Sequence, residues 1–186
     1  MKTITLFFLS LCLIMVSCEK DNNNQDNNLS LLTELNGESG LSYDESLSKW
    51  NELKNNNGNS YIYQTTFTSW TGFGSTTELR VEEGNVTSRK YQGFEINQTN
   101  GQKEILETYH ETSDNLGSND KGANPLTIDE LYETCASEYL IIDENNNTIY
   151  FETTENGLMT LCGYVPEGCM DDCLFSVSID FFDWID

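Results

Sequence analysis

The spacing of apolar positions along the chain predicts two amphipathic helices. The first begins at Ser42, which can form a capping box with Glu45, and it ends in the polar run 55–58. The second begins in the same way at Thr127. Its apolar positions follow the i, i+3, i+4, i+7 and i+11 spacing of one helical face: Ile128, Leu131, Tyr132, Cys135 and Tyr139. Each helix therefore presents an apolar face that has to pack on another element.

Most of the remaining chain reads as β-strands rich in aromatic and β-branched residues. Asn156-Gly157 separates two of them and is a strong hairpin signal. The segment from Phe175 to Phe181 alternates apolar and polar positions, as a half-buried final strand does. The other expected strands are 60–70, 76–82, 86–94, 103–110, 148–154 and 158–165, with a long polar loop at 114–124. This order predicts an α+β fold: a mainly antiparallel β-sheet with two helices packed on one face, formed by residues 31–186 as one domain.

The N-terminus has the pattern of a secretory signal peptide over residues 1–17. Lys2 supplies a positive charge, and an apolar run from Ile4 to Val16 follows it. This run is shorter than the ~20 apolar residues that a membrane-spanning helix needs. We therefore expect the chain to be exported, with its first segment removed.

Ile14-Met15-Val16-Ser17-Cys18 resembles a bacterial lipobox, although Met15 occupies the usual leucine position. The resemblance implies cleavage before Cys18 and attachment of lipid, including palmitate, to its thiol. The alternative is ordinary cleavage nearby, with Cys18 as a free or paired thiol. The polar, asparagine-rich segment 18–30 is expected to be a disordered tether. Its acidic residues resemble the surface-export signals of Bacteroidota-type lipoproteins, which implies a lipid anchor in the outer membrane and exposure on the cell surface.

The net charge of −22 narrows the classes of partner. Nucleic acid and anionic membrane surfaces would both be repelled, so we expect neither. Two explanations for the charge stay open: solubility at a cell surface, or binding of cations or of a basic protein.

Part of the chain also resembles an uncharacterised family of secreted and lipoprotein domains, over roughly Leu47 to Phe182. The segments that carry the resemblance are Val81-Glu-Glu-Gly-Asn-Val86, the start of the second helix at Leu126, Glu155-Asn-Gly-Leu158 and Cys162-Gly-Tyr-Val-Pro-Glu-Gly-Cys169-Met-Asp-Asp-Cys173. The resemblance implies no activity.

Four cysteines of the domain form an even set in an exported chain, which predicts disulfides: Cys135, Cys162, Cys169 and Cys173. Counting outward from the Asn156-Gly157 turn places Cys162 opposite Phe151, on the expected core face. Cys135 lies on the apolar face of the second helix, so we favour Cys135–Cys162, and Cys169–Cys173 follows by elimination. The first bridge would contribute roughly 3 kcal/mol. Four cysteines can pair in three ways, and all three pairings stay open. A zinc site at Cys169 and Cys173 in a reduced protein also stays open.

Candidate chemistry is sparse. His110 is the single histidine, and the chain lacks the Gly-x-Ser-x-Gly, His-Glu-x-x-His and P-loop motifs. Asp171-Asp172 is an adjacent carboxylate pair, the residue type that a hydrolase would use. Residues 143–147 resemble the start of a calcium loop, but Thr148 replaces the required glycine, so we interpret them as a polar turn.

Trp70 and Phe73 lie on a glycine-containing connection between two predicted strands. Two arrangements of these side chains stay open. In one they form a flat platform that binds a sugar or a protein, and in the other they fold back over the sheet edge. We expect a monomeric, non-enzymatic surface lipoprotein without a metal or cofactor, with a binding or structural role and a protein or glycan partner. The alternative is an extracellular carboxylate-dependent hydrolase.

Overall fold

The computed structural model describes residue 35 and residues 40–185. The predicted signal peptide, Cys18 and the predicted tether lie outside the described residues. The elements, in chain order, are α2 (Tyr43–Asn57), β1 (Tyr61–Thr68), β2 (Phe73–Glu82), β3 (Asn85–Ile96), β4 (Lys103–Thr112), α3 (Ile128–Thr134), the π-helical turn η1 (Cys135–Tyr139), β5 (Asn147–Thr153), β6 (Met159–Pro166), β7 (Phe175–Ser178) and β8 (Phe181–Trp184).

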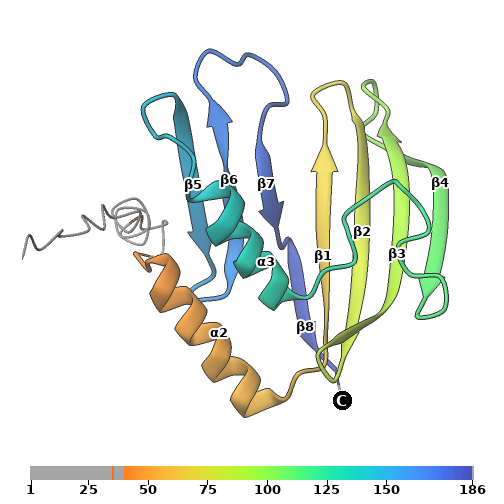
Figure 1. The fold of residues 1–186 in the computed structure, drawn as a ribbon. Helices are drawn as coiled ribbons and strands as arrows, with labels where there is room; N and C mark the ends of the chain where they lie inside the picture. Colours follow the sequence, from red (N-terminus) through yellow and green to blue (C-terminus); the bar gives the residue numbers. More distant parts are fainter. Residues whose placement is uncertain (1–34, 36–39, 186) are drawn as a thin grey trace, which may run out of the picture.

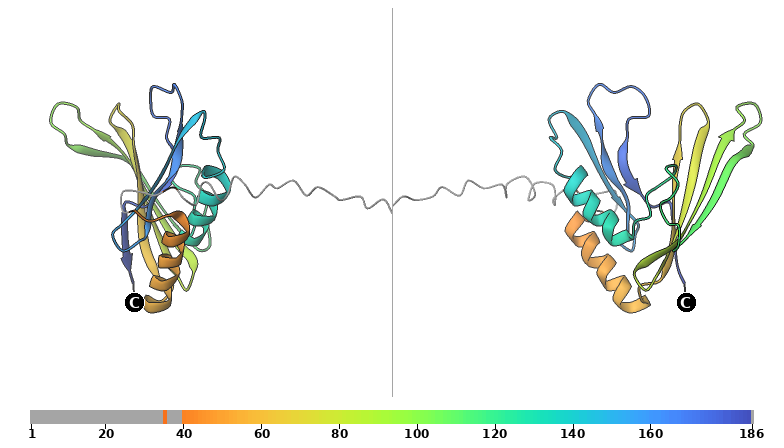
Figure 2. Two further views of the ribbon diagram at one scale, coloured as in Figure 1. Left: turned by 90° about the vertical axis from the view of Figure 1, so that its left-hand side faces the viewer. Right: turned by 45° about the vertical axis from the view of Figure 1, so that its right-hand side comes forward.

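The strands form two antiparallel sheets. The first has the order β4-β3-β2-β1-β8, and the second has the order β5-β6-β7 (Figure 1). The two sheets lean apart toward the end that carries the β1–β2 turn (Figure 2). The predicted α+β class is confirmed, whereas the division of the strands into two sheets is not visible in the sequence pattern.

The chain changes sheets at Ile179 and Asp180. The N–H of Ile179 donates to the carbonyl of Thr160 on β6, and the N–H of Asp180 donates to the carbonyl of Gln64 on β1. Strand β7 therefore belongs to the second sheet and β8 to the first. The prediction of one final strand through this segment is wrong, because Ile179 is buried between the two sheets and the strand breaks there.

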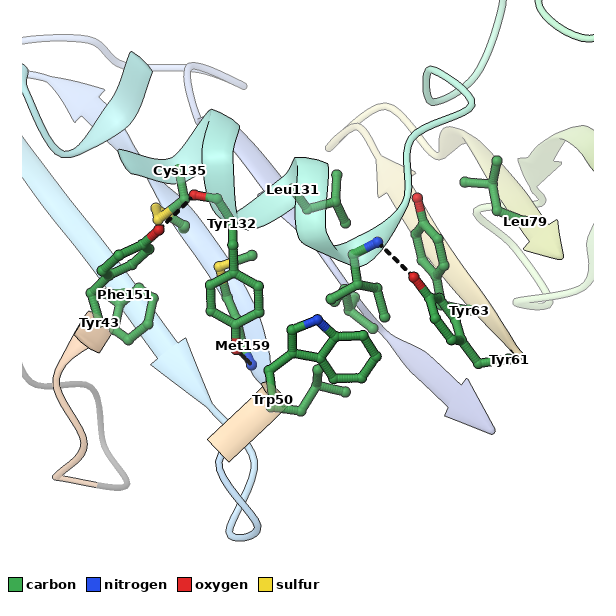
Figure 3. Packing of buried hydrophobic residues seen from close by; sticks show 14 of the residues in the cluster. Tyr43, Trp50, Tyr61, Tyr63, Leu79, Leu131, Tyr132, Cys135, Phe151 and Met159 are labelled. Atoms are coloured by element: carbon green, nitrogen blue, oxygen red, sulfur yellow. Dashed lines mark hydrogen bonds between the residues drawn. A yellow bond between two sulfur atoms is a disulfide. The ribbon is translucent and has the colours of Figure 1, made fainter. Parts of the chain in front are cut away.

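Helix α2 spans both sheets and holds them together. Its capping box at Ser42 and Glu45 is present as predicted. Near its start, Tyr43 packs edge-on against Phe151 of the second sheet, and its hydroxyl donates to the carbonyl of Tyr132 at 3.0 Å (Figure 3). About two turns further on, Trp50 is fully buried against the aromatic side chains of the first sheet: Tyr61, Phe182 and Trp184. The core is therefore shared by both sheets.

The second helix also begins as predicted, with a capping box between Thr127 and Glu130. After Thr134 it widens into the turn η1, where the N–H of Leu140 donates to the carbonyl of Cys135 five residues earlier. Residues 135–139 therefore form a single wider turn that ends at Tyr139. The helix thus places Cys135 over the second sheet and Tyr139 beside β7.

The predicted disulfide pairing is confirmed. Cys135 is bonded to Cys162 with a Cα–Cα distance of 5.6 Å, and Cys169 is bonded to Cys173. Phe151 pairs with Cys162 as the hairpin count predicted. Nearer the turn the count differs, because Thr153 pairs with Met159 and an irregularity after Glu152 restores the register.

Candidate binding groove

A groove lies between the two sheets, with a cavity volume of about 510 Å³. One wall comes from the inner face of β1 and the loop that crosses it. The opposite wall comes from the α3–η1 segment and from β7. The lining residues are Tyr63 and Thr65 of β1; Gly122, Ala123, Asn124 and Leu126 of the loop; Leu131, Thr134, Glu138 and Tyr139 of the helix; and Ser176, Val177 and Ser178 of β7. We call this the inter-sheet groove.

Two further hollows continue the groove across the first sheet. The nearer one, about 290 Å³, shares Thr65, Gly122 and Ala123 with the inter-sheet groove. The farther one, about 320 Å³, shares Phe67 and Ser75 with the nearer one. The farther hollow is also lined by Phe73, Gly74, Tyr91, Gly93, Phe94, Leu106, Glu107 and Lys121. Together the three hollows form one elongated depression, which we call the trough.

The alternation of side chains along the strands accounts for the trough. In β1, Tyr61 and Tyr63 point into the core. Thr65 and Phe67 lie further along the same face of the strand, where the core no longer covers it. Phe67 is paired with Ser75, which is in turn paired with Gly93. These two small residues leave the sheet surface uncovered beside a phenylalanine that is 57% exposed.

The loop between β4 and α3 forms one edge of the trough and is held by a buried ion pair. Arg89 and Glu111 are both buried, and Nη1 of Arg89 lies 3.1 Å from Oε2 of Glu111. The Glu111 carboxylate also accepts the backbone N–H groups of Gly117 at 2.7 Å and Asn119 at 2.8 Å. Arg89 donates to the carbonyls of Asn119 and Lys121. The pair therefore fixes the loop through backbone groups on both sides of its bend.

At Gly122 this loop lies directly on the sheet. A Cβ atom at this position would come within 2.6 Å of the Thr77 hydroxyl and 2.7 Å of the Tyr91 ring, and the backbone φ is +79°. Glycine alone accommodates both the contact and the left-handed backbone. The next residue, Ala123, donates its N–H to the Thr77 hydroxyl at 3.0 Å. The edge of the trough thus has a defined position.

The pKa of Glu111 reflects its role in holding the loop. Burial raises the pKa of this carboxyl, but the hydrogen bonds from Asn119 and Gly117, together with the Arg89 charge, outweigh burial and lower the pKa to about 2. The carboxylate is consequently ionised, and the loop is anchored, through the whole neutral and mildly acidic range.

The inter-sheet groove is lined mainly by hydroxyl and apolar groups. The hydroxyls of Thr65 and Ser178 are hydrogen-bonded at 2.8 Å across it, and Tyr63 donates to the carbonyl of Leu126 at 2.6 Å. Among the described residues that line it, Glu138 is the single charged side chain. Burial raises the pKa of the Tyr139 hydroxyl, so this group stays a neutral donor. Such a lining suits a neutral or cationic ligand with hydrogen-bonding groups.

The predicted binding loop lies at the far end of the trough. Trp70 is 73% exposed and does not fold back over the sheet, whereas Phe73 is 50% exposed and lies partly against it. Phe73 lines the farther hollow, whereas Trp70 lines none of the three. The neighbouring Ser69 donates its hydroxyl to Asp172 at 2.6 Å, which links this turn to the Cys169–Cys173 loop.

The other predicted candidates lie away from the trough. His110 is exposed on β4 and pairs in register with Lys90. Asp171 and Asp172 are exposed at the tip of the β6–β7 connection and line none of the hollows. Asp143 accepts the N–H of Asn145 at 3.0 Å and the side-chain amides of Asn145 and Asn146, which confirms the polar turn.

Sequence reasoning did not identify the residues that line the inter-sheet groove. Ser176, Ser178 and Thr65 belong to ordinary strand patterns, and Glu138 was one acidic residue among 31. A weak signal was available at Tyr139, because the helical spacing placed it on the apolar face beyond Cys135. The pattern did not show that this face extends past the covering sheet.

Comparison with protein-family models, curated proteins and solved structures gave no match. Within residues 40–185 no cluster of three or more histidine, cysteine, aspartate or glutamate side chains is arranged to hold a metal ion. The helices in that range lack the length and apolar character needed to cross a bilayer.

Proposed function

We propose that this protein is an exported surface lipoprotein that binds an elongated ligand along the trough and catalyses no reaction. The observation that carries the proposal is the continuity of the three hollows, in which each hollow shares lining residues with its neighbour, so that the trough runs from Tyr139 to Phe73. Ligand sites are concave and combine apolar surface with a few polar groups; the farther hollow supplies mainly apolar surface, and the inter-sheet groove supplies hydroxyl groups. Because it is long and shallow, it suits a peptide or an oligosaccharide better than a compact metabolite.

A carboxylate-dependent hydrolase stays an alternative, but no specific observation favours it. Such an enzyme needs two carboxyl groups about 5–10 Å apart around the bond that it cleaves. Among the described residues, the inter-sheet groove is lined by the carboxylate of Glu138 alone, and the farther hollow by that of Glu107, which is paired with Lys121.

Binding along the trough predicts different effects for two aromatic residues of one turn. The purified full chain, in detergent, would be applied to a glycan array and to a peptide array. Phe73→Ala should lower the affinity for the captured ligand about tenfold, the effect of losing one aromatic contact worth ~1.4 kcal/mol. Trp70→Ala, the matched control outside the trough, should leave affinity unchanged.

Stability separates this result from a folding defect. Trp70→Ala should change the free energy of unfolding by no more than ~0.5 kcal/mol, and the half-buried Phe73 by ~1 kcal/mol. Equal losses of affinity in both variants would argue against the trough as the site. Failure of both arrays to yield a ligand would remove the proposal.

The lipid anchor rests on the segment Ile14 to Cys18 and on cysteine pairing: the domain's four cysteines form two disulfides, and Cys12 is removed with the predicted signal peptide, which leaves Cys18 as the odd cysteine. Cells expressing the protein and supplied with an alkyne analogue of palmitate should incorporate the label into the wild-type chain. Cys18→Ser should abolish the label, because the thiol is the attachment point. Equal labelling of both chains would contradict an anchor at Cys18.

The cellular location follows from the same proposal. Two or more acyl chains bind a membrane stably, whereas one chain gives only marginal binding, at about 0.8 kcal/mol per buried CH₂. We place the anchor in the outer membrane with the domain on the outer side, where the net charge of −22 supports solubility and admits a basic or neutral partner.

A further inference from the structure

Strand β7 has a backbone edge that points into the inter-sheet groove. Directly after β7, the N–H of Ile179 donates to the carbonyl of Thr160 on β6, and backbone groups of successive strand residues point to alternating sides. Ser176 and Ser178 therefore direct their N–H and C=O groups away from β6. The close approach of Ser176 to Gly163 agrees: a Cβ on Gly163 would lie 2.4 Å from the Ser176 Cβ, as expected for a pair without mutual hydrogen bonds.

Within residues 40–185, β7 ends the second sheet. The nearest strand of the first sheet, β1, pairs with β8 only as far as Gln64, and the N–H of the following Thr66 is taken by the Asp180 carboxylate. At this level the hydroxyls of Thr65 and Ser178 are hydrogen-bonded between the two sheets. The β7 edge consequently faces the groove at Ser176, whereas at Ser178 it lies opposite Thr65 of β1.

This edge lacks the protection that natural edge strands carry. Exposed edges are usually defended against pairing by lysine, proline, a bulge or an inward-pointing charge. The sequence of β7 is Phe-Ser-Val-Ser, which contains no charged residue and no proline. An unprotected edge that lines a cavity of about 510 Å³ is a template for an incoming strand.

The charges around the edge define the side chains that the strand would carry. Among the described residues that line the inter-sheet groove there is one carboxylate, Glu138, and no lysine or arginine. The exposed Asp180 lies at the junction of the sheets, two residues after Ser178 in the chain, and the protein as a whole carries a net charge of −22. The groove therefore favours a cationic segment, and its apolar residues Leu131 and Val177 offer packing for the alternate side chains.

We propose that the inter-sheet groove accepts an extended basic peptide, which adds as a fourth strand to the free edge of β7 and places a lysine or arginine near Glu138. The inference rests on the trough as the binding site and specifies its ligand. The three residues of β7 before Ser178 match a peptide core of about 10 Å at 3.3 Å per residue. Main-chain hydrogen bonds would supply affinity, and alternate side chains would supply selectivity.

The test begins with a displayed library of ten-residue peptides, selected on the full chain in detergent. Selected peptides should be rich in lysine, arginine and β-branched residues and lack proline in their centres. The strongest peptide is then synthesised in three forms: unmodified, N-methylated at alternate residues in either phase, and with glutamate in place of its basic residues. One N-methylated phase and the acidic form should bind at least tenfold more weakly, the effect of losing ~1.4 kcal/mol.

Protein variants test the same edge from the other side. Ser176→Pro removes the N–H that faces the groove and should lower the affinity for the peptide about tenfold, since one hydrogen bond contributes ~1 kcal/mol or more. Ser176→Ala keeps that N–H and should bind within about threefold of wild type. Glu138→Gln should reduce the preference for the basic over the acidic peptide. Thermal unfolding of each variant reports whether it folds, and if Ser176→Pro does not, the N-methylated peptides still decide.

The outcomes distinguish this inference from the proposed function. Equal binding of N-methylated and unmodified peptides would overturn strand addition and leave the trough as a site. If only glycans bind, and Phe73→Ala lowers their affinity, strand addition is also overturned and the trough remains a binding site. Self-association that Ser176→Pro abolishes would assign the edge to a second copy of the chain and overturn the peptide. Absence of any ligand in both screens would remove the proposed function as well.

Discussion

Replacing Glu111 by glutamine is expected to lower the free energy of unfolding by about 3–5 kcal/mol at neutral pH. The substitution leaves the guanidinium of Arg89 buried without its counter-charge, and it weakens the carboxylate's hydrogen bonds to Gly117 and Asn119. Urea unfolding at pH 7 measures the effect. Glu107→Gln is the matched control, because its ion pair with Lys121 is exposed to solvent and should contribute little to stability.

The pH dependence provides an independent check. The folded-state pKa of Glu111 is lowered to about 2, against an ordinary value of 4.5. A lowered folded-state pKa stabilises the protein above the ordinary value, and this contribution is lost as the pH falls from 4.5 toward 2. Wild-type stability should therefore decrease in that window more steeply than the stability of Glu111→Gln. Parallel curves for the two proteins would show that the carboxylate is not the anchor.

Loss of the Glu111 anchor should also affect the trough. Gly122 and Ala123 belong to the same loop and line both the inter-sheet groove and the adjoining hollow. A ligand bound there would be weakened by Glu111→Gln even though Glu111 itself lines none of the hollows. Glu107→Gln does not serve as the control for this measurement, because Glu107 lines the farther hollow.

Removing the Cys135–Cys162 disulfide should cost about 3.5 kcal/mol, the chain-entropy value for a loop of 27 residues. Both cysteines are fully buried, and the bond joins the helix to the central strand of the second sheet. For a protein of this size the loss corresponds to a fall in melting temperature of about 7–14 °C. Scanning calorimetry of the Cys135→Ala, Cys162→Ala double variant measures it.

The Cys169→Ala, Cys173→Ala double variant is the control. Its loop spans only four residues, so the same chain-entropy model assigns this disulfide about 2 kcal/mol. The disulfide lies on an exposed connection, so its removal does not disturb the core. The melting temperature should fall less than in the first double variant. Equal losses in the two would show that the fixed position of the helix on the sheet contributes nothing beyond a local loop.

Local rules in the sequence were sufficient for the helices, the disulfide and the strand assignments near turns. Ser42 with Glu45 and Thr127 with Glu130 form capping boxes because each pair is only three residues apart and needs no distant partner. Counting from Asn156-Gly157 paired Phe151 with Cys162 because a hairpin register depends on the turn and the alternation of its own strands. These features involve short separations along the chain.

The division into two sheets and the trough were decided only by the tertiary structure. The residues from Phe175 to Phe181 alternate as one strand would, but β7 and β8 pair with different partners because Ile179 is buried where the sheets diverge. Arg89 lies in a predicted strand and Glu111 follows the end of another, and nothing in the pattern pairs them; their burial follows from a loop that returns over the sheet. Periodicity reports which face of an element is apolar, whereas what covers that face, and where the cover ends, depends on sheet twist and on contacts between residues distant in the chain.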